Sequence, residues 1–69
     1  MDRRVARTKK NIYYAFFQLV QTKAIDEITV SELARAADID RKTFYLHYQT
    51  VQDVFVEFKQ MIHDRLMEI

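Results

Sequence analysis

Glycine and proline are both absent from this chain of 69 residues. Most tight turns depend on one of them, because glycine adopts positive φ without strain and proline fixes φ near a value that turns need. Here every turn must be formed by residues such as Asp, Asn, Thr or Gln. Helix-forming residues are plentiful, among them Ala, Leu, Lys, Arg, Glu and Gln. These features predict one small all-α domain.

Cysteine is absent as well, so neither a disulfide nor a thiolate metal site can stabilise the domain. Such a composition suits a reducing compartment, and we expect the cytoplasm. A chain of this size buries only about 60% of its unfolded surface. Stability must therefore come from packed apolar side chains or from a partner chain. No apolar run approaches the roughly 20 residues of a membrane span, and the basic N-terminus is not followed by a signal-peptide core.

Hydrophobic spacing predicts four helices, at about residues 8–23, 30–37, 41–47 and 51–68, after a basic arm at residues 1–7. In the first helix, Ile12, Phe16 and Leu19 recur at helical spacing, and the neighbouring aromatic residues are expected to pack in or near the core. The fourth helix ends in apolar residues without a cap. We therefore expect the chain to be the first part of a longer protein. The expected apolar stripe of this helix comprises Val54, Phe55, Phe58, Met61, Ile62 and Leu66.

Capping residues separate the second and third predicted helices. Thr29 and Glu32 fit a capping box, in which each side chain accepts a hydrogen bond from the backbone N–H of the other residue. Asp38 is expected to take the left-handed conformation that ends the second helix. Asp40 is then a good N-cap for the third helix. The sequence therefore predicts a helix–turn–helix at residues 29–48.

Two apolar contacts are expected to orient the third helix. Ile39 precedes the N-cap and Phe44 follows it by four residues, which is the arrangement of a hydrophobic staple. Phe44 and Tyr48 are four residues apart and are expected to face inward together, which turns Lys42, Tyr45 and Leu46 outward. The fourth helix begins with a second capping signature, Thr50 to Asp53.

Positive charge is concentrated at two places along the chain, although the net charge is only +1. Residues 1–10 carry five basic residues and one acidic residue, and residues 41–49 contain Arg41 and Lys42 without an acidic residue. Acidic residues are in excess in the other two segments, 11–40 and 50–69. A basic tail by itself is weak evidence for nucleic-acid contact, because many such tails are solvated arms.

Catalytic chemistry is poorly represented. Ser31 is the only serine, with no histidine near it in sequence, and there is no cysteine nucleophile. His47 and His63 are sixteen residues apart and do not have the spacing of a metal site. Without glycine there is no phosphate-binding loop. We expect no enzymatic activity, no metal and no cofactor.

The exposed side of the third helix fits DNA recognition better. In a helix–turn–helix, the N-terminal residues of the second helix lie against base edges in the major groove. Arg41 and Lys42 occupy these positions and can bind guanine O6 and N7. Thr43 can bind a base or a phosphate, and Tyr45 can pack on a thymine methyl group or donate to a phosphate. Together these residues favour binding to double-stranded DNA.

Other residues are candidates for phosphate contacts. The helix N-termini at Thr29 and Thr50 are expected to offer free backbone N–H groups to an anion. His47 can donate to a phosphate, although a purely structural surface role is nearly as good an explanation. The arm residues Arg3, Arg4 and Arg7 can reach phosphates or a neighbouring minor groove.

The residues from about Arg7 to Phe58 resemble the N-terminal DNA-binding domain of the TetR family of transcriptional regulators, which is homeodomain-like. The most specific part of the resemblance is Thr43-Phe44-Tyr45-x-His47-Tyr48 after a helix and turn. It implies that Thr29 contacts a phosphate. It also implies that Ser31 and the residues at the start of the third helix face bases, and that Tyr45 and His47 contact bases or phosphates. The resemblance further implies a homodimeric bacterial repressor on a palindromic operator. The small-molecule inducer of such a protein would be bound by a C-terminal domain that is absent from this sequence.

Three positions depart from the common pattern of that family. Asp38 replaces the usual turn glycine, Lys42 stands where a small residue is common, and Val51 stands where a phosphate-binding lysine is common. The rival hypothesis is a helical protein-interaction module without a role in DNA binding. It is supported by the acidic balance outside the tail and by the apolar end of the fourth helix.

Overall fold

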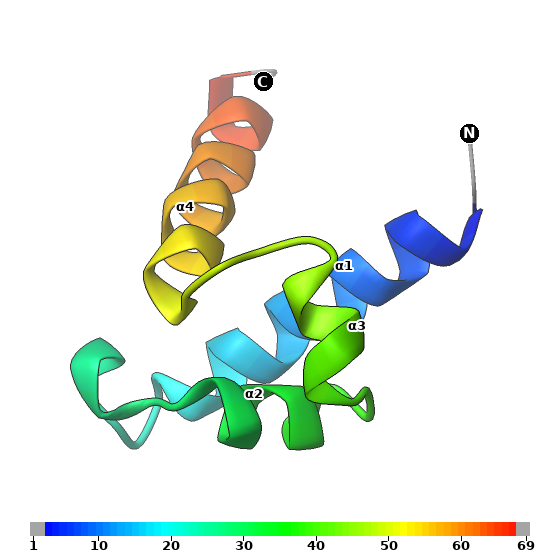
Figure 1. The fold of residues 1–69 in the computed structure, drawn as a ribbon. Helices are drawn as coiled ribbons and strands as arrows, with labels where there is room; N and C mark the ends of the chain where they lie inside the picture. Colours follow the sequence, from blue (N-terminus) through cyan, green and yellow to red (C-terminus); the bar gives the residue numbers. More distant parts are fainter. Residues whose placement is uncertain (1–2, 68–69) are drawn as a thin grey trace.

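A computed structural model describes residues 3–67 as an all-helical domain, with no strand in that range. The described residues form four α-helices and one short 3-10 helix, which confirms the predicted all-α class. Figure 1 shows how the α-helices are arranged. The elements are α1 (Arg3–Leu19), η1 (Ile25–Glu27), α2 (Val30–Ala36), α3 (Arg41–Tyr45) and α4 (Val51–Met67). The first two residues of the predicted arm, the predicted helical end at residue 68 and the apolar Ile69 lie outside the described residues.

Helix α1 begins and ends earlier than predicted. It starts at Arg3 instead of near residue 8, because the basic segment consists largely of Arg, Lys and Ala, which propagate a helix well. It ends at Leu19 instead of near residue 23. There the side-chain amide of Gln21 donates to the Phe17 carbonyl at 3.1 Å, and the Thr22 hydroxyl donates to the Leu19 carbonyl at 3.5 Å. Such local side-chain bonds compete with helix continuation, and the chain turns instead.

The core lies where α1 meets the other three α-helices. Each α-helix contributes one or two of the largest fully buried side chains, so all four α-helices take part in the core. These side chains are Ile12, Phe16, Leu33, Phe44 and Val54. Tyr48, after α3, is also buried, which confirms that it faces inward together with Phe44.

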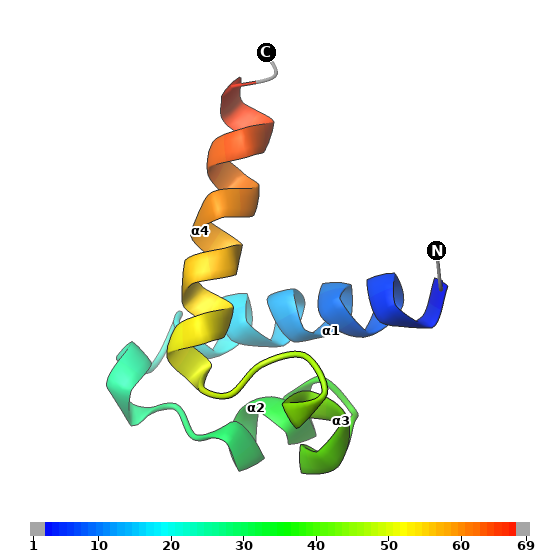
Figure 2. The same ribbon diagram turned by 45° about the horizontal axis from the view of Figure 1, so that its top comes forward.

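Helix α4 contributes to the core only through its N-terminal half. Val51 and Val54 are buried, whereas Phe55 and Phe58 are partly buried and pack against the core from outside. Phe16 contacts Phe58 edge to face, with ring centroids 5.5 Å apart. Figure 2 shows the C-terminal half of α4 projecting away from the other helices, and the predicted stripe residues Ile62 and Leu66 are exposed there.

A polar bridge that the sequence did not predict joins α1 to α4. The Glu57 carboxylate accepts hydrogen bonds from the Tyr13 hydroxyl at 2.6 Å and from the Lys9 ammonium group at 3.0 Å. Burial by itself would raise the pKa of Glu57, but these two hydrogen bonds outweigh it and the pKa is lowered. The Lys9 ammonium group also lies 5.5 Å from the centre of the Tyr48 ring. The bridge therefore holds together α1, α4 and the residue that anchors the end of α3.

We expect Tyr13→Phe to lower the free energy of unfolding by about 1–2 kcal/mol, because it removes a hydrogen bond to a partly buried carboxylate. Tyr14→Phe is the matched control, since the exposed Tyr14 undergoes the same change outside the bridge, and it should shift stability by less than about 0.5 kcal/mol. Urea unfolding followed by circular dichroism measures both. Equal effects of the two substitutions would contradict the bridge.

The uneven use of α4 gives a second prediction. Leu33→Ala removes a fully buried side chain and should cost about 2–5 kcal/mol. The same change at Leu66, which is 65% exposed, should cost less than about 0.5 kcal/mol. Thermal and urea unfolding of the two variants test the contrast, and a large loss at Leu66 would show that the C-terminal half of α4 packs against something within the chain.

Candidate nucleic-acid interface

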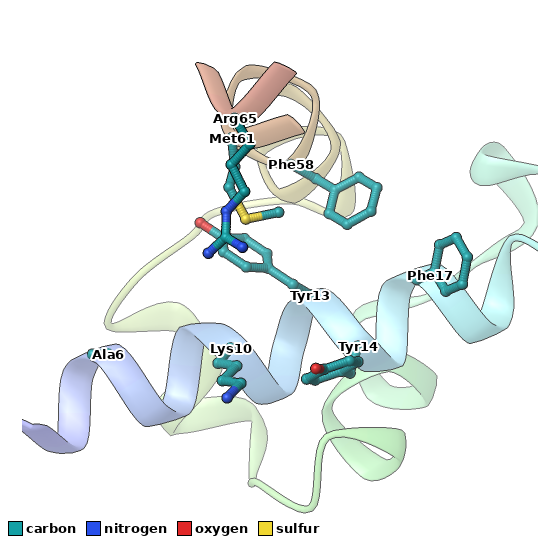
Figure 3. Close-up of a pocket in the computed structure, with 8 residues that line it drawn as sticks. All are labelled: Ala6, Lys10, Tyr13, Tyr14, Phe17, Phe58, Met61 and Arg65. Carbon is teal, nitrogen blue, oxygen red and sulfur yellow. The ribbon is translucent and has the colours of Figure 1, made fainter. Parts of the chain in front are cut away.

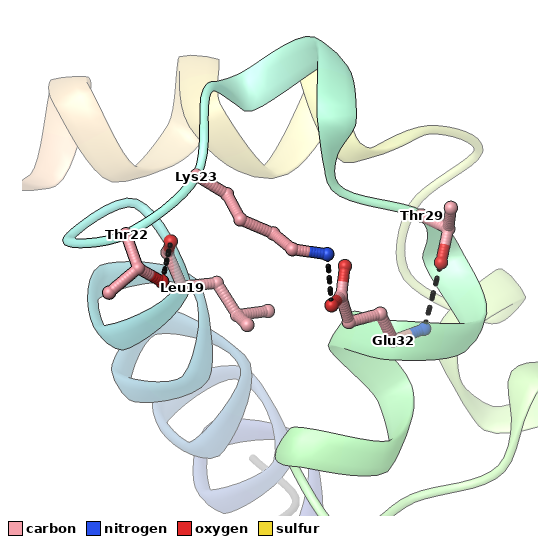
Figure 4. A network of polar contacts seen from close by, with 5 residues as sticks. All are labelled: Leu19, Thr22, Lys23, Thr29 and Glu32. Carbon is pink, nitrogen blue, oxygen red and sulfur yellow. Dashed lines mark hydrogen bonds and ion pairs between the residues drawn. The ribbon is translucent and has the colours of Figure 1, made fainter.

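The N-terminus of α2 is fixed by a cap and an ion pair, shown in Figure 4. The Thr29 hydroxyl accepts a hydrogen bond from the Glu32 N–H at 3.1 Å, as the predicted cap requires. The Glu32 carboxylate is bound mainly by the Lys23 ammonium group at 2.5 Å. This bond is the largest cause of the lowered pKa of Glu32, and the Thr29 backbone makes a smaller contribution. The start of α2 is thereby tied to the connection that follows α1.

The turn between α2 and α3 has the geometry expected from its sequence. Asp38 has a φ of 60°, in the left-handed region. The Ile39 N–H donates to the Ala34 carbonyl at 2.9 Å, and the Asp38 N–H donates to the Arg35 carbonyl at 3.1 Å. These two bonds form a Schellman motif, which satisfies carbonyl groups at the end of α2. Asp38 therefore takes the place of a glycine, as predicted.

Asp40 caps α3. Its carboxylate accepts a hydrogen bond from the Thr43 N–H at 2.7 Å. Hydrogen bonding from the Thr43 side chain and from its backbone N–H holds the pKa of Asp40 below its usual value. Two aspartates therefore form the connection between α2 and α3. Asp38 adopts the left-handed backbone conformation of the turn, and Asp40 caps α3.

Helix α3 is short, covering Arg41–Tyr45, whereas residues 41–47 were predicted. The chain nevertheless stays in helical turns beyond Tyr45. Leu46 has φ −70° and ψ −23°, and the N–H groups of His47 and Tyr48 both donate to the Phe44 carbonyl at 3.0 Å. The side chains of residues 46–48 therefore continue the helical arrangement of α3.

The structure brings most of the predicted base-facing residues to one surface. Arg41, Lys42 and Tyr45 are exposed on α3, and Thr43 is partly buried. The Arg41 guanidinium donates to the Ser31 hydroxyl at 3.5 Å, which places Ser31 of α2 beside the start of α3. The partly buried His47 lies at the other end of this surface. Contact of any of these residues with DNA stays a prediction.

The N-terminus of α4 is capped by Thr50 and Asp53, as the capping signature predicts. The Asp53 carboxylate accepts hydrogen bonds from the N–H groups of Gln49 and Thr50, each at 3.1 Å, and the Thr50 hydroxyl accepts from the Asp53 N–H at 3.2 Å. The N–H of Thr50 itself is therefore not free for a phosphate, because the Asp53 carboxylate accepts it within the cap. The carboxylate also places a negative charge where an anion was expected to bind. Contact of this helix N-terminus with a phosphate stays a prediction.

Arg3, Arg4 and Arg7 were predicted to form a flexible arm, but they lie on the first turns of α1 and are exposed there. In Figures 1 and 2 this end of α1 extends beyond α3. The basic charge is therefore carried on a rigid helix, whose position relative to α3 is fixed by the core.

A hollow of about 540 Å³ lies between α1 and α4. Figure 3 shows it lined mainly by aromatic and apolar side chains, with Lys10 and Arg65 at its edges and with α2 and α3 on the other side of α1. None of the predicted base or phosphate contacts lines it. Within residues 3–67, no cluster of three or more metal-binding side chains occurs, and none of the described helices is both long and apolar enough to cross a bilayer.

Comparison with known proteins identifies two curated relatives. The chain is 34% identical to the HTH-type dhaKLM operon transcriptional activator DhaS of Lactococcus lactis, over 83% of this chain and 33% of that protein. It is 36% identical to the uncharacterised HTH-type transcriptional regulator YxbF of Bacillus subtilis, over 78% of this chain and 14% of that protein. The chain thus spans about a third and about a seventh of the two relatives. No protein-family model matches the chain, and no solved structure matches it.

Both relatives are named as helix–turn–helix regulators and neither as an enzyme. The names agree with the helix–turn–helix formed by α2 and α3.

The lowered pKa of Asp40 gives a pH prediction. Because the folded-state pKa lies below the unfolded value of about 3.9, the carboxylate stabilises the fold above about pH 4, and this contribution is lost as pH falls through the folded-state pKa. Asp40→Asn keeps a good N-cap but removes the titration. We expect the urea midpoint of the native chain to fall more steeply between about pH 5 and pH 2.5 than that of Asp40→Asn. Parallel curves would show that the Asp40 charge does not stabilise α3.

Proposed function

We propose that this chain is the DNA-reading domain of a transcriptional regulator, with α3 placed in the major groove of double-stranded DNA. The observation that carries the proposal is the geometry of α3. Phe44 and Tyr48 are buried on one side. Lys42 is exposed on the opposite side, and Arg41 is exposed at its flank, at the N-terminal end of the helix. This is the end that contacts base edges in helix–turn–helix proteins.

Base contacts are assigned to Ser31, Arg41, Lys42, Thr43 and Tyr45. The Arg41 guanidinium donates one hydrogen bond to the uncharged Ser31 hydroxyl and has further N–H donors. It can therefore approach guanine O6 and N7 with two donors, while Ser31 remains near the same base pair. Thr43 is less accessible, which limits it to a base or phosphate close to the helix.

Phosphate contacts are assigned to both sides of this surface. Thr29 is exposed at the start of α2, and His47 follows α3. Arg3, Arg4 and Arg7 extend the basic surface along α1, so their reach is that of a rigid helix. Thr50 can contribute through its hydroxyl, since its N–H is used by Asp53. Such contacts fix register and supply much of the affinity, whereas the base contacts supply sequence preference.

We further propose that the full protein is a TetR-type, ligand-responsive regulator that acts in the cytoplasm as a homodimer on a palindromic operator. The resemblance of Thr43–Tyr48 to that family supports this, as does the greater length of both relatives. A small-molecule inducer would then bind outside this chain. Repression is the expected outcome for the family, whereas DhaS is named as an activator, so the proposal leaves the sign of regulation open.

The rival function is a helical protein-interaction module. The hollow between α1 and α4 favours it, because Tyr14 and Phe17 are exposed beside it. This hollow and the α3 surface lie on different sides of α1 (Figure 3), so a protein partner there does not exclude DNA at α3.

Salt dependence and a substitution at Arg41 test the DNA-reading proposal. Binding to duplex DNA should weaken steeply as salt increases, because counterions are released from the phosphates. Arg41→Ala should weaken a selected duplex by about 1–3 kcal/mol and random DNA by less. Fluorescence anisotropy with the chain and with a tandem dimer measures both, since one copy reads only one half-site.

Arg65→Ala is the matched control. Arg65 is also exposed, but it lies near the end of α4 beside the hollow. Its loss should affect selected and random duplexes little and equally. Equal loss on all duplexes for Arg41→Ala would remove Arg41 as a base reader, and no duplex binding at low salt by either form of the chain would contradict the proposed function.

A further inference from the structure

Leu46 is the most exposed of the large apolar side chains in the described residues, at 74%. It received no role in the assignments above. With about 3.6 residues per helical turn, a side chain two positions from both Phe44 and Tyr48 points almost directly away from them. Because Phe44 and Tyr48 are buried, Leu46 lies at the centre of the outward face of the α3 turn.

Leu46 has a cationic and aromatic side toward α3, and on its other side it lines a hollow together with His47, Asp53 and Glu57. Lys42 is one helical turn earlier on the same outward face, and Tyr45, which is 54% exposed, is adjacent. The N–H of Leu46 donates to the Thr43 carbonyl at 3.2 Å, so its backbone is held in the turn while its side chain is free of the core. A single exposed leucine needs no explanation. Here, however, the apolar group is centred on the outward face that carries Lys42 and Tyr45.

We propose that Leu46 reads the C5-methyl group of thymine, so that the preferred half-site has a thymine next to the bases contacted by Lys42. This inference rests on the proposed placement of α3 in the major groove. Thymine is the one base that presents a methyl group there, and an apolar side chain recognises it by excluding water from the contact. The basic residues draw a polyanion to this face, which is why duplex DNA is the occupant that fits this apolar side chain.

Replacing thymine by uracil in the duplex tests this directly, because it removes the methyl group and leaves base pairing intact. Duplexes that bind the native chain are first selected from a randomised library at low salt. Thymines are then replaced by uracil one position at a time, and binding is measured by anisotropy. At the position read by Leu46, the native chain should bind the uracil duplex about fourfold more weakly, the affinity equivalent of one buried methyl group.

Variants assign the effect to the side chain. Leu46→Ala should bind the thymine duplex more weakly and should not distinguish thymine from uracil at that position, whereas Leu46→Met keeps an apolar contact and should still distinguish them. Leu66→Ala is the matched control, with the same substitution at a similarly exposed leucine at the far end of α4. It should behave as the native chain. Circular dichroism of each variant verifies that the helices are retained.

Three results separate this inference from the function on which it rests. If the native chain binds selected duplexes but no uracil substitution weakens binding, the methyl contact is wrong and DNA binding stands. If Leu46→Ala still distinguishes the two bases, another residue such as Tyr45 reads the methyl group and the assignment to Leu46 is overturned. If no duplex is bound at low salt, the proposed function itself fails.

Discussion

Burial of Phe44 is the interaction on which the functional part of this structure depends. Helix α3 covers only Arg41–Tyr45, far below the length at which a helix is stable in water by itself. It persists because Phe44 is fully buried and because Tyr48 follows it into the same core. The rings of Phe44 and Tyr48 contact each other, with centroids 5.6 Å apart. The same contact decides which side of α3 faces outward. Burial of Phe44 and Tyr48 therefore both stabilises α3 and exposes the residues proposed to contact DNA.

Local chemistry explains why the helix–turn–helix could be predicted. The cap at Thr29, the left-handed Asp38 and the cap at Asp40 each involve residues no more than a few positions apart. Their backbone preferences therefore act before any tertiary contact forms. The absence of glycine and proline strengthened the inference, since it left few residues that could form the turn. The inward direction of Phe44 and Tyr48 followed from their spacing alone.

The errors have equally specific causes. Residues 1–7 were predicted to form an arm ahead of the first helix, but α1 already begins at Arg3, because Arg and Lys are good helix formers. Thr50 was predicted to contact a phosphate because helix N-termini attract anions, but the Asp53 carboxylate of the same capping signature accepts its N–H. The bridge of Lys9, Tyr13 and Glu57 joins residues more than 40 positions apart. No sequence period relates such residues, so only the folded arrangement shows the bridge.

The excess of acidic residues in segments 11–40 and 50–69 has a structural explanation, which weakens it as an argument against DNA binding. Asp40 and Asp53 accept backbone N–H groups at helix starts, Glu32 binds Lys23, and Glu57 binds Lys9 and Tyr13. These carboxylates satisfy internal donors, so the total charge of a segment says little about the charge it presents. The exposed start of α3 remains basic through Arg41 and Lys42. Since Asp53 occupies the start of α4, the proposed mode of binding must draw its phosphate contacts mainly from the start of α2, from His47 and from the first turns of α1.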